Sequence, residues 1–198
     1  MSYAAKYISE AKKILEALDI SQIEKVVEKI VQVREASGRI FFLGVGGGAG
    51  HASHAVSDFR KIGEIECYAP TDNVSELTAR INDEGWETVF VNWLKGSHLN
   101  ERDAIFIFSV GGGSHRHHIS VNLVAALKHA KEVGTKILGI VGRDGGETAK
   151  VADVSVIVPP LYPETVTSHT EAFQAVIWHL LISHPKIRKI NMKWESMK

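Results

Sequence analysis

The hydrophobic residues at the start of the chain recur with the spacing of an α-helix. The first apolar face consists of Ile8, Ala11, Leu15 and Leu18. Ser21, with Glu24 three residues later, has the pattern of a capping box and predicts the N-terminus of a second helix. The apolar face of that helix consists of Ile23, Val26, Val27, Ile30, Val31 and Val33. Because Gly38 ends this pattern, residues 1–37 are predicted to form a helical hairpin.

Beyond Gly38, short apolar runs alternate with longer helical stretches. The runs with the character of buried strands are 39–44, 65–68, 104–109, 136–141 and 154–158. The helical stretches between them include 49–61, 121–133 and 164–183. This alternation is typical of βαβ units, whose strands lie parallel and whose crossovers are right-handed. The sequence therefore predicts an α/β fold: a three-layer α/β/α sandwich with a five-stranded parallel sheet, preceded by the helical hairpin.

Length and composition favour one ordinary globular domain. The chain has 198 residues, of which 44% are hydrophobic and 23% are charged, and no linker or repeat divides it. We therefore assign residues 1–198 to a single domain, with the hairpin in 1–37 and the α/β core in 38–198.

Charge and cysteine content exclude several functional classes. The 23 Lys and Arg balance the 23 Asp and Glu, so no global basic field attracts nucleic acid or an anionic membrane. Cys67 is the single cysteine, which excludes an internal disulfide and a multi-cysteine metal site. No apolar run approaches the ~20 residues of a membrane-spanning helix, and the first residues lack a signal-peptide core. These features predict a cytoplasmic protein with no nucleic-acid or membrane partner.

Two glycine-rich segments follow predicted strands, where parallel α/β sheets bind ligands. The first, Gly44–Gly50, contains G-x-G, but only Glu66 is a candidate for the ribose-binding acid of a dinucleotide site. Neither segment has the lysine and hydroxyl of a Walker motif, so we expect no nucleotide cofactor. The second, Ser109–Ser114, combines glycine amides with two hydroxyls, and residues 115–118 (His-Arg-His-His) add positive charge. This segment is a candidate phosphate cradle, although glycines also form simple tight turns.

Two pairs of polar residues on predicted helices have spacings that suit chemistry. His54 and Asp58 are four residues apart, so they share one helical face directly after the first glycine segment. Such a pair can bind a metal, orient a carboxylate base beside an imidazole, or lie solvated on a surface. Glu171 and His179 share a face of the last helix, about 12 Å apart along its axis. For Glu171 and His179 to reach one metal, both side chains would have to lean toward a common point, and one of the two could instead contact substrate.

The first half of the chain resembles the SIS (sugar isomerase) domain proteins and, within them, the phosphoheptose isomerases. Residues 44–54 (GVGGGAGHASH), with Asp58 one turn later, resemble the family's glycine loop and its His-x-x-x-Glu helix. Residues 77–86 (LTARINDEGW) resemble the family's L-T-A-x-x-N-D-x-G segment, in which we predict a turn at Asp83.

The second half continues the resemblance in the same order. Residues 142–146 (GRDGG), followed by Ala152-Asp153 and Val158-Pro159, resemble the family's glycine turn and last strand. Glu171 and His179 stand where the family has Gln and His on its last helix.

The resemblance implies an aldose–ketose isomerase that converts D-sedoheptulose 7-phosphate to D-glycero-D-manno-heptose 7-phosphate through a cis-enediol. Asp58 is then the candidate base and His179 the acid. The implied substrate-binding residues are Gly47, Gly48, Asp83, Ser109, Gly111, Ser114 and Glu171. The implied ligands of a zinc ion are His54, Asp58, Glu171 and His179. The family also implies a homotetramer whose sites draw on neighbouring chains.

The chain departs from the family pattern mainly in its loops. Val45 and Gly48 replace an Asn and a Ser, and 109–114 (SVGGGS) replaces the usual S-T-S-G-N-S. About six extra residues, 115–120, follow that loop, while Asp58 replaces Glu and Glu171 replaces Gln. Because several substrate donors are missing, two alternatives stay open. One is a non-catalytic sugar-phosphate sensor or protein-binding regulator, and the other is an isomerase of another phosphosugar.

Overall fold

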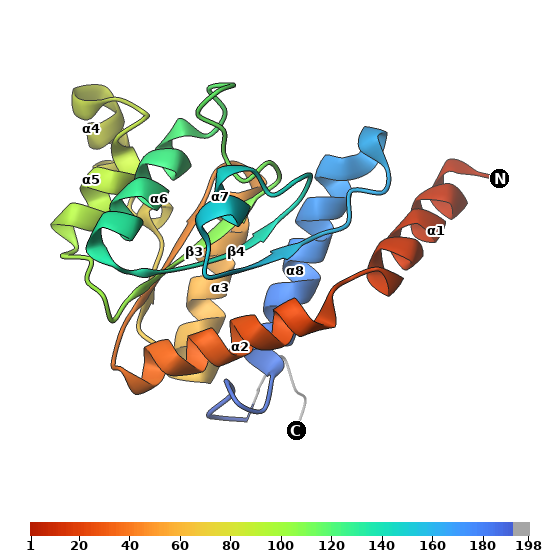
Figure 1. The fold of residues 1–198 in the computed structure, drawn as a ribbon, viewed down its shortest axis with the longest axis horizontal. Coiled ribbons are helices and arrows are strands. Elements are labelled where there is room, and N and C mark those ends of the chain that lie inside the picture. Colours follow the sequence, from red (N-terminus) through yellow and green to blue (C-terminus); the bar gives the residue numbers. More distant parts are fainter. Residues whose placement is uncertain (192–198) are drawn as a thin grey trace.

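A five-stranded parallel sheet forms the centre of the molecule (Figure 1), and the computed structural model describes residues 1–191. The strands are β1 (Ile40–Gly44), β2 (Cys67–Tyr68), β3 (Ala104–Ser109), β4 (Lys136–Val141) and β5 (Val154–Ile157). Their order is β2-β1-β3-β4-β5, and every pair is parallel. The predicted five-stranded parallel sheet is therefore confirmed, with β2 shorter than the sequence indicated.

Helices surround this sheet. They are α1 (Tyr3–Glu16), α2 (Ile20–Glu35), α3 (Gly47–Gly63), α4 (Val74–Glu84), α5 (Val89–Gly96), α6 (Val121–Val133), α7 (Gly146–Val151) and α8 (Val166–Ser183). Two short 3₁₀ turns, Pro70–Asp72 and Pro163–Thr165, precede α4 and α8. The bounds of α6 are those predicted, whereas α4 and α5 were not placed by the sequence pattern. None of the helices within residues 1–191 has the length and apolar character needed to cross a membrane.

Alternate residues of each strand point to opposite faces of the sheet and pack into two separate hydrophobic cores. The sheet therefore lies between two layers of helices, as predicted. Phe42 of β1 and Phe106 of β3 face the core shared with α2, α3 and α8. Phe41 and Ile105, their neighbours in the chain, face the core shared with α5 and α6. A parallel strand that is covered on both faces needs apolar side chains at every position, as the strand sequences show.

The N-terminal helices differ from the prediction in two respects. Asp19, rather than Ser21, caps α2, because its carboxylate accepts hydrogen bonds from the amides of Ser21 (2.9 Å) and Gln22 (3.3 Å). The helices also do not fold back on each other as a hairpin, since α1 projects away from the start of α2 (Figure 1). Ile8 and Leu15, on the predicted apolar face of α1, are consequently 68% and 54% exposed.

The opposite side of α1 is attached to the end of the molecule that carries α8. Glu10 is buried, and its Oε2 lies 3.0 Å from Nε2 of His169 and accepts a 2.9 Å hydrogen bond from the Thr165 hydroxyl. Tyr7 stacks on the His169 ring at 4.2 Å. The bond from His169 lowers the pKa of Glu10, so this carboxylate stays ionised at neutral pH. A charged, hydrogen-bonded contact thus adds to an apolar one, in which Ile14 is buried and Ala11 and Leu18 of the predicted face pack against the core.

The carboxyl ends of β1 and β3 form the edge at which a site is expected. The chain leaves β1 for α3 on one face of the sheet, and after β3 it continues to α6 on the other face. Ligands bind at such a switch point because the diverging connections leave a crevice beyond the strand ends. Both glycine-rich segments of the sequence lie at this edge.

Candidate functional site

A cavity of about 650 Å³ opens beyond the ends of β1, β3 and β4. Five of the residues predicted to bind substrate line it: Gly48, Ser109, Gly111, Ser114 and Glu171. The volume lies within the range of small-molecule sites, about 300–1,000 Å³. The structure therefore brings the two glycine-rich loops and the last helix to one concave surface.

Glu171 joins the cavity to the start of α3. A Cβ atom at Gly47 would lie only 2.5–2.6 Å from the carboxylate atoms of Glu171, so this glycine is needed for the close contact. The N-cap of α3 is Gly46, which has no side chain to cap the helix. A carboxylate placed against a helix N-terminus is favoured by the helix dipole and the unpaired amides. Glu171 thus lies against the first turn of α3 and at the wall of the cavity.

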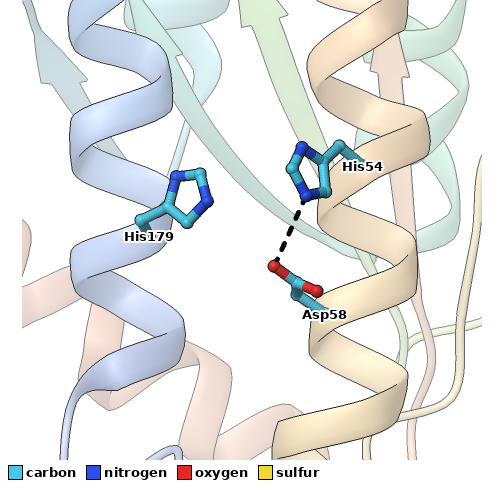
Figure 2. Close-up of side chains that lie close together, drawn as sticks. All are labelled: His54, Asp58 and His179. Atoms are coloured by element: carbon cyan, nitrogen blue, oxygen red, sulfur yellow. Dashed lines mark ion pairs between the residues drawn. The ribbon is translucent and has the colours of Figure 1, made fainter. Parts of the chain in front are cut away.

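A cluster of two imidazoles and one carboxylate lies further along the same two helices. His54 and Asp58 of α3 face His179 of α8 (Figure 2), and one donor atom from each lies within 4.8 Å of the others. The Nε2 atom of His54 is 3.7 Å from Oδ2 of Asp58. The His54 and His179 rings are nearly perpendicular, with centroids 5.5 Å apart. This arrangement is the candidate catalytic cluster.

The local structure orients each member of the cluster. Nδ1 of His179 is 2.8 Å from the carbonyl oxygen of Ala175, one turn earlier, which favours the proton on Nδ1. The other ring nitrogen then points toward His54 and Asp58 (Figure 2). Asp58 is only 6% exposed, whereas the His54 side chain is 60% exposed and packs edge-on against Trp178 at 4.7 Å. The carboxylate is therefore shielded while one imidazole faces the solvent.

His51 lies between the cavity and the cluster and was not among the predicted site residues. Burial lowers its pKa, and the Glu171 carboxylate opposes that shift. The net shift favours a neutral imidazole at neutral pH. Its position one turn before His54 was visible in the sequence, but nothing in the spacing separated it from an ordinary helical residue.

Two predicted site residues lie apart from the cluster. Glu171 contacts Gly47 rather than joining the three donors, so its role as a metal ligand stays a prediction. Asp83 is in α4 and not in a turn, and α4 belongs to the layer on the opposite face of the sheet. Asp83 does not line the cavity of a single chain, and its predicted contact with substrate stays untested.

Comparison with known proteins places this geometry in a family. The family described as SIS domain matches residues 6–142. This chain belongs to the SIS domain family. It is 31% identical over 182 residues to a probable phosphoheptose isomerase from Thermoplasma volcanium, covering 89% of this chain and 87% of the relative. It is also 31% identical to the phosphoheptose isomerase of Helicobacter pylori over 153 residues, covering 75% and 76% of the two chains.

Two solved structures illustrate the architecture that this chain shares with known proteins. The phosphoheptose isomerase from Neisseria gonorrhoeae superposes with a TM-score of 0.78 at 25% identity, over 90% of this chain and 95% of the other. The Vibrio vulnificus NanR protein, complexed with ManNAc-6P, superposes with a TM-score of 0.63 at 14% identity, over 90% and 59%. The second likeness concerns the fold alone.

The contact between Gly47 and Glu171 can be tested by a pair of matched glycine substitutions. Gly50→Ala, at a position of α3 with open space around it, should raise the free energy of unfolding by about 0.5–1 kcal/mol. Gly47→Ala should lack this gain because the Glu171 carboxylate has to move. In the Glu171→Ala background the gain should return, with a coupling energy of about 1 kcal/mol in urea denaturation. Equal stabilisation by both alanines in both backgrounds would contradict the contact.

Proposed function

We propose that this protein is an aldose–ketose isomerase that interconverts D-sedoheptulose 7-phosphate and D-glycero-D-manno-heptose 7-phosphate. The observation that carries the proposal is the cluster of His54, Asp58 and His179 on helices that also border the cavity. The names of the two relatives described above support the same reaction.

The reaction moves a proton between C1 and C2 of the open-chain sugar through a cis-enediol. Asp58 is the proposed base, since a shielded carboxylate beside an imidazole can accept the carbon-bound proton. His179 is the proposed acid: Nδ1 is held by the Ala175 carbonyl, so the proton for the developing oxyanion comes from Nε2 of the doubly protonated ring, which faces the cluster from the opposite helix. The two groups therefore reach the reacting carbons from two different helices.

The distance between cluster and cavity suits an extended substrate. Glu171 borders the cavity, and His179 lies about 12 Å further along α8. In our proposal the phosphate group of the substrate lies at the loop formed by residues 109–114. The reacting carbons lie at the cluster of His54, Asp58 and His179. A sugar phosphate in its open-chain form spans this path, whereas the ring form is more compact. The proposed contacts of Gly47, Gly48 and Glu171 with the substrate lie along the path.

The cluster also fits a divalent metal. Ligand atoms around a tetrahedral zinc lie roughly 3.3–3.5 Å apart, given bond lengths of about 2.0–2.2 Å. The three donors, already within 4.8 Å of one another, reach that spacing through small side-chain movements. We propose zinc as the ion, held by His54, Asp58 and His179, with Glu171 as the predicted fourth ligand. Asp58 and His179 serve as base and acid in the metal-free cluster; when zinc is bound they would act as its ligands, and the ion would supply positive charge for the oxygen atoms of the enediol.

Metal content tests the ligand set without relying on turnover. The purified protein should contain near-stoichiometric zinc by elemental analysis, and His54→Ala and His179→Ala should each lose most of it. His98→Ala, at an exposed position outside the cluster, is the matched control. Glu171→Ala separates three ligands from four, since only a ligand should weaken zinc binding. Metal-free wild-type protein that takes up no zinc on dialysis would contradict the site.

Proton NMR in D₂O tests the reaction directly. Wild-type protein with sedoheptulose 7-phosphate should produce aldose anomeric signals and incorporate deuterium at the carbon that exchanges its proton. Asp58→Asn should lower kcat by about 10²–10⁴-fold, because it removes the base while keeping the shape. Asp72→Asn, an exposed substitution, should have no effect. Saturable binding without turnover or exchange would indicate the sensor, and turnover of another phosphosugar alone would indicate a different substrate.

Self-association as a homotetramer is part of the proposal. Exposed apolar side chains support it, because Tyr3, Ile8 and Leu15 of α1 and Ile20 at the start of α2 face solvent in the single chain. Val176 and Leu180 of α8 are also exposed, close in sequence to the cluster residue His179. Apolar faces of this kind are typical of interaction sites, and we assign them to further copies of the chain. The predicted cytoplasmic location is consistent with a phosphorylated substrate.

Light scattering after gel filtration tests the assembly. The expected mass of the wild-type protein is four times the chain mass of 21.8 kDa. Changing both Ile8 and Leu15 to Lys should reduce this mass, because it places charges on the apolar face of α1. Lys12→Gln on the same helix should leave the mass unchanged. A monomeric wild-type protein at micromolar concentration would contradict the proposal.

A further inference from the structure

In the loop at residues 109–114, two of the amides that could bind a phosphate already form hydrogen bonds within the protein. The Ser109 hydroxyl oxygen accepts a 3.0 Å hydrogen bond from the amide of Gly112, so that amide is not available to a ligand. The amide of Ser114 donates to the carbonyl of Ile119 at 2.8 Å, and its hydroxyl oxygen accepts from the amide of His117 at 3.2 Å. Phosphate cradles normally present such amides to the anion. Here the amides of Gly112 and Ser114 hold the loop itself in place, while the two hydroxyl groups accept hydrogen bonds and keep their own O–H donors.

The loop that follows β4 is held against the loop at residues 109–114 by hydrogen bonds between their backbones. The amides of Glu147 and Thr148 donate to the carbonyls of Gly113 (3.0 Å) and Gly112 (2.9 Å). A Cβ atom at Gly112 would overlap the carbonyl of Gly145, so the two loops touch at their glycines. The first amides of α7 are therefore also occupied. An anion in this cavity needs donors other than these amides.

Arg143 is placed to supply such donors. It lines the cavity, and its side chain passes beside Gly111, where a Cβ atom would lie 3.9 Å from Cδ of Arg143. Its backbone has φ of +50°, in the left-handed region that non-glycine residues rarely adopt. Such conformations cost energy and are concentrated at ligand sites. The fold thus keeps an arginine at a position where glycine is less strained.

Arg116 reaches the same cavity from the extra segment that follows the first loop. Residues 115–118 are closed at their base by paired hydrogen bonds between Ser114 and Ile119, at 2.8 and 3.1 Å. Both Arg116 and its neighbour His117 line the cavity. The segment is therefore a closed loop with a defined base, and it carries positive charge to the cavity wall.

The cavity is lined by carboxylates, namely Asp144, Glu147 and Glu171, as well as by cations, but none of these carboxylates is within ion-pair distance of the two arginines. Lys150 also lines it, but its Nζ is paired with Glu147 at 2.9 Å. Neither Arg116 nor Arg143 forms an ion pair with a carboxylate among residues 1–191. Arginine offers a planar set of donors that matches phosphate oxygens. Two unpaired guanidinium groups on one cavity indicate an anionic ligand.

Gln174 adds an independent sign that the ligand also carries hydroxyl groups. It is fully buried, lines the cavity, and donates through Nε2 to the carbonyl of Ile140 at 2.9 Å. Its Oε1 is buried and has no hydrogen-bond partner within the described residues. A buried acceptor without a partner is costly, and a ligand hydroxyl would satisfy it. Anion and hydroxyl together describe a sugar phosphate.

We propose that Arg116 and Arg143, the arginine pair, bind the phosphate group of the substrate in place of the occupied loop amides. The identity of the sugar rests on the proposed isomerase function, whereas recognition of the phosphate does not. The extra segment is then a specificity element, because it brings one of the two arginines to the cavity. Electrostatic recognition of this kind weakens as salt increases.

Calorimetric titration with inorganic phosphate, and with sedoheptulose 7-phosphate, tests the arginine pair. Arg116→Gln and Arg143→Gln should each weaken the binding of both ligands by about 10-fold or more, and should raise KM more than they lower kcat. The wild-type affinity should fall as NaCl is raised, and the double variant should show a much weaker salt dependence. Lys131→Gln removes one exposed charge of α6 outside the cavity and should change neither.

Arg143→Gly separates binding from folding. Glycine tolerates a φ of +50°, so this variant should melt at the same temperature as the wild type or higher while losing phosphate affinity. Affinities of both Gln variants within two-fold of the wild type, or a wild type that binds no phosphate, would overturn the proposal. Arginine-dependent phosphate binding without turnover would uphold the arginine pair and count against the isomerase. Turnover that is unaffected by the Gln variants would support the isomerase and contradict the arginine pair.

Discussion

The close packing of α3 against α8 is the constraint on which the site depends. Both helices begin near the carboxyl edge of the sheet and run side by side (Figure 1). Glycines of α3 allow the contact at both ends: Gly47 meets the carboxylate of Glu171, and a Cβ at Gly63 would lie 3.1 Å from Cδ1 of Ile182. Larger side chains at these positions would push the helices apart. Because the donors of the cluster come from both helices, their spacing is set by this packing.

The glycine loops at the carboxyl edge have a structural purpose beyond ligand binding. Gly112 and Gly146 are required because the loops after β3 and β4 approach each other through their backbones. This contact occupies amides that a phosphate would otherwise use. The charge that an anionic ligand needs is therefore supplied by side chains, which reach the cavity from Arg116 and Arg143. Rigidity of the edge and recognition of the ligand are thus divided between backbone and side chains.

The sequence patterns predicted the structure correctly where the hydrophobic residues follow one clear period. They were wrong where contacts with distant parts of the chain determine which side chains are buried. The strand at 104–109 is buried on both faces, so its continuous apolar run could be recognised directly. The i,i+4 spacing of His54 and Asp58 likewise placed both on one face of α3. The apolar face predicted for α1 was only half right: Ala11 and Leu18 pack against the core, whereas Ile8 is exposed and Glu10 is buried against His169. A pattern cannot tell that a carboxylate has a buried partner more than 150 residues away.

Local periodicity and turn chemistry were enough to predict the parallel sheet, its flanking layers and the positions of the two glycine-rich loops. Which donors come into contact depends instead on how distant helices pack. The tertiary structure joined His179 to the cluster and placed Glu171 against Gly47, since the register of α3 against α8 depends on side-chain packing and not on spacing within either helix. Asp83, which was predicted in a turn, lies in α4 on the opposite face of the sheet. Contacts between distant segments depend on how the side chains of both segments fit together. The sequence of one segment alone does not contain that information.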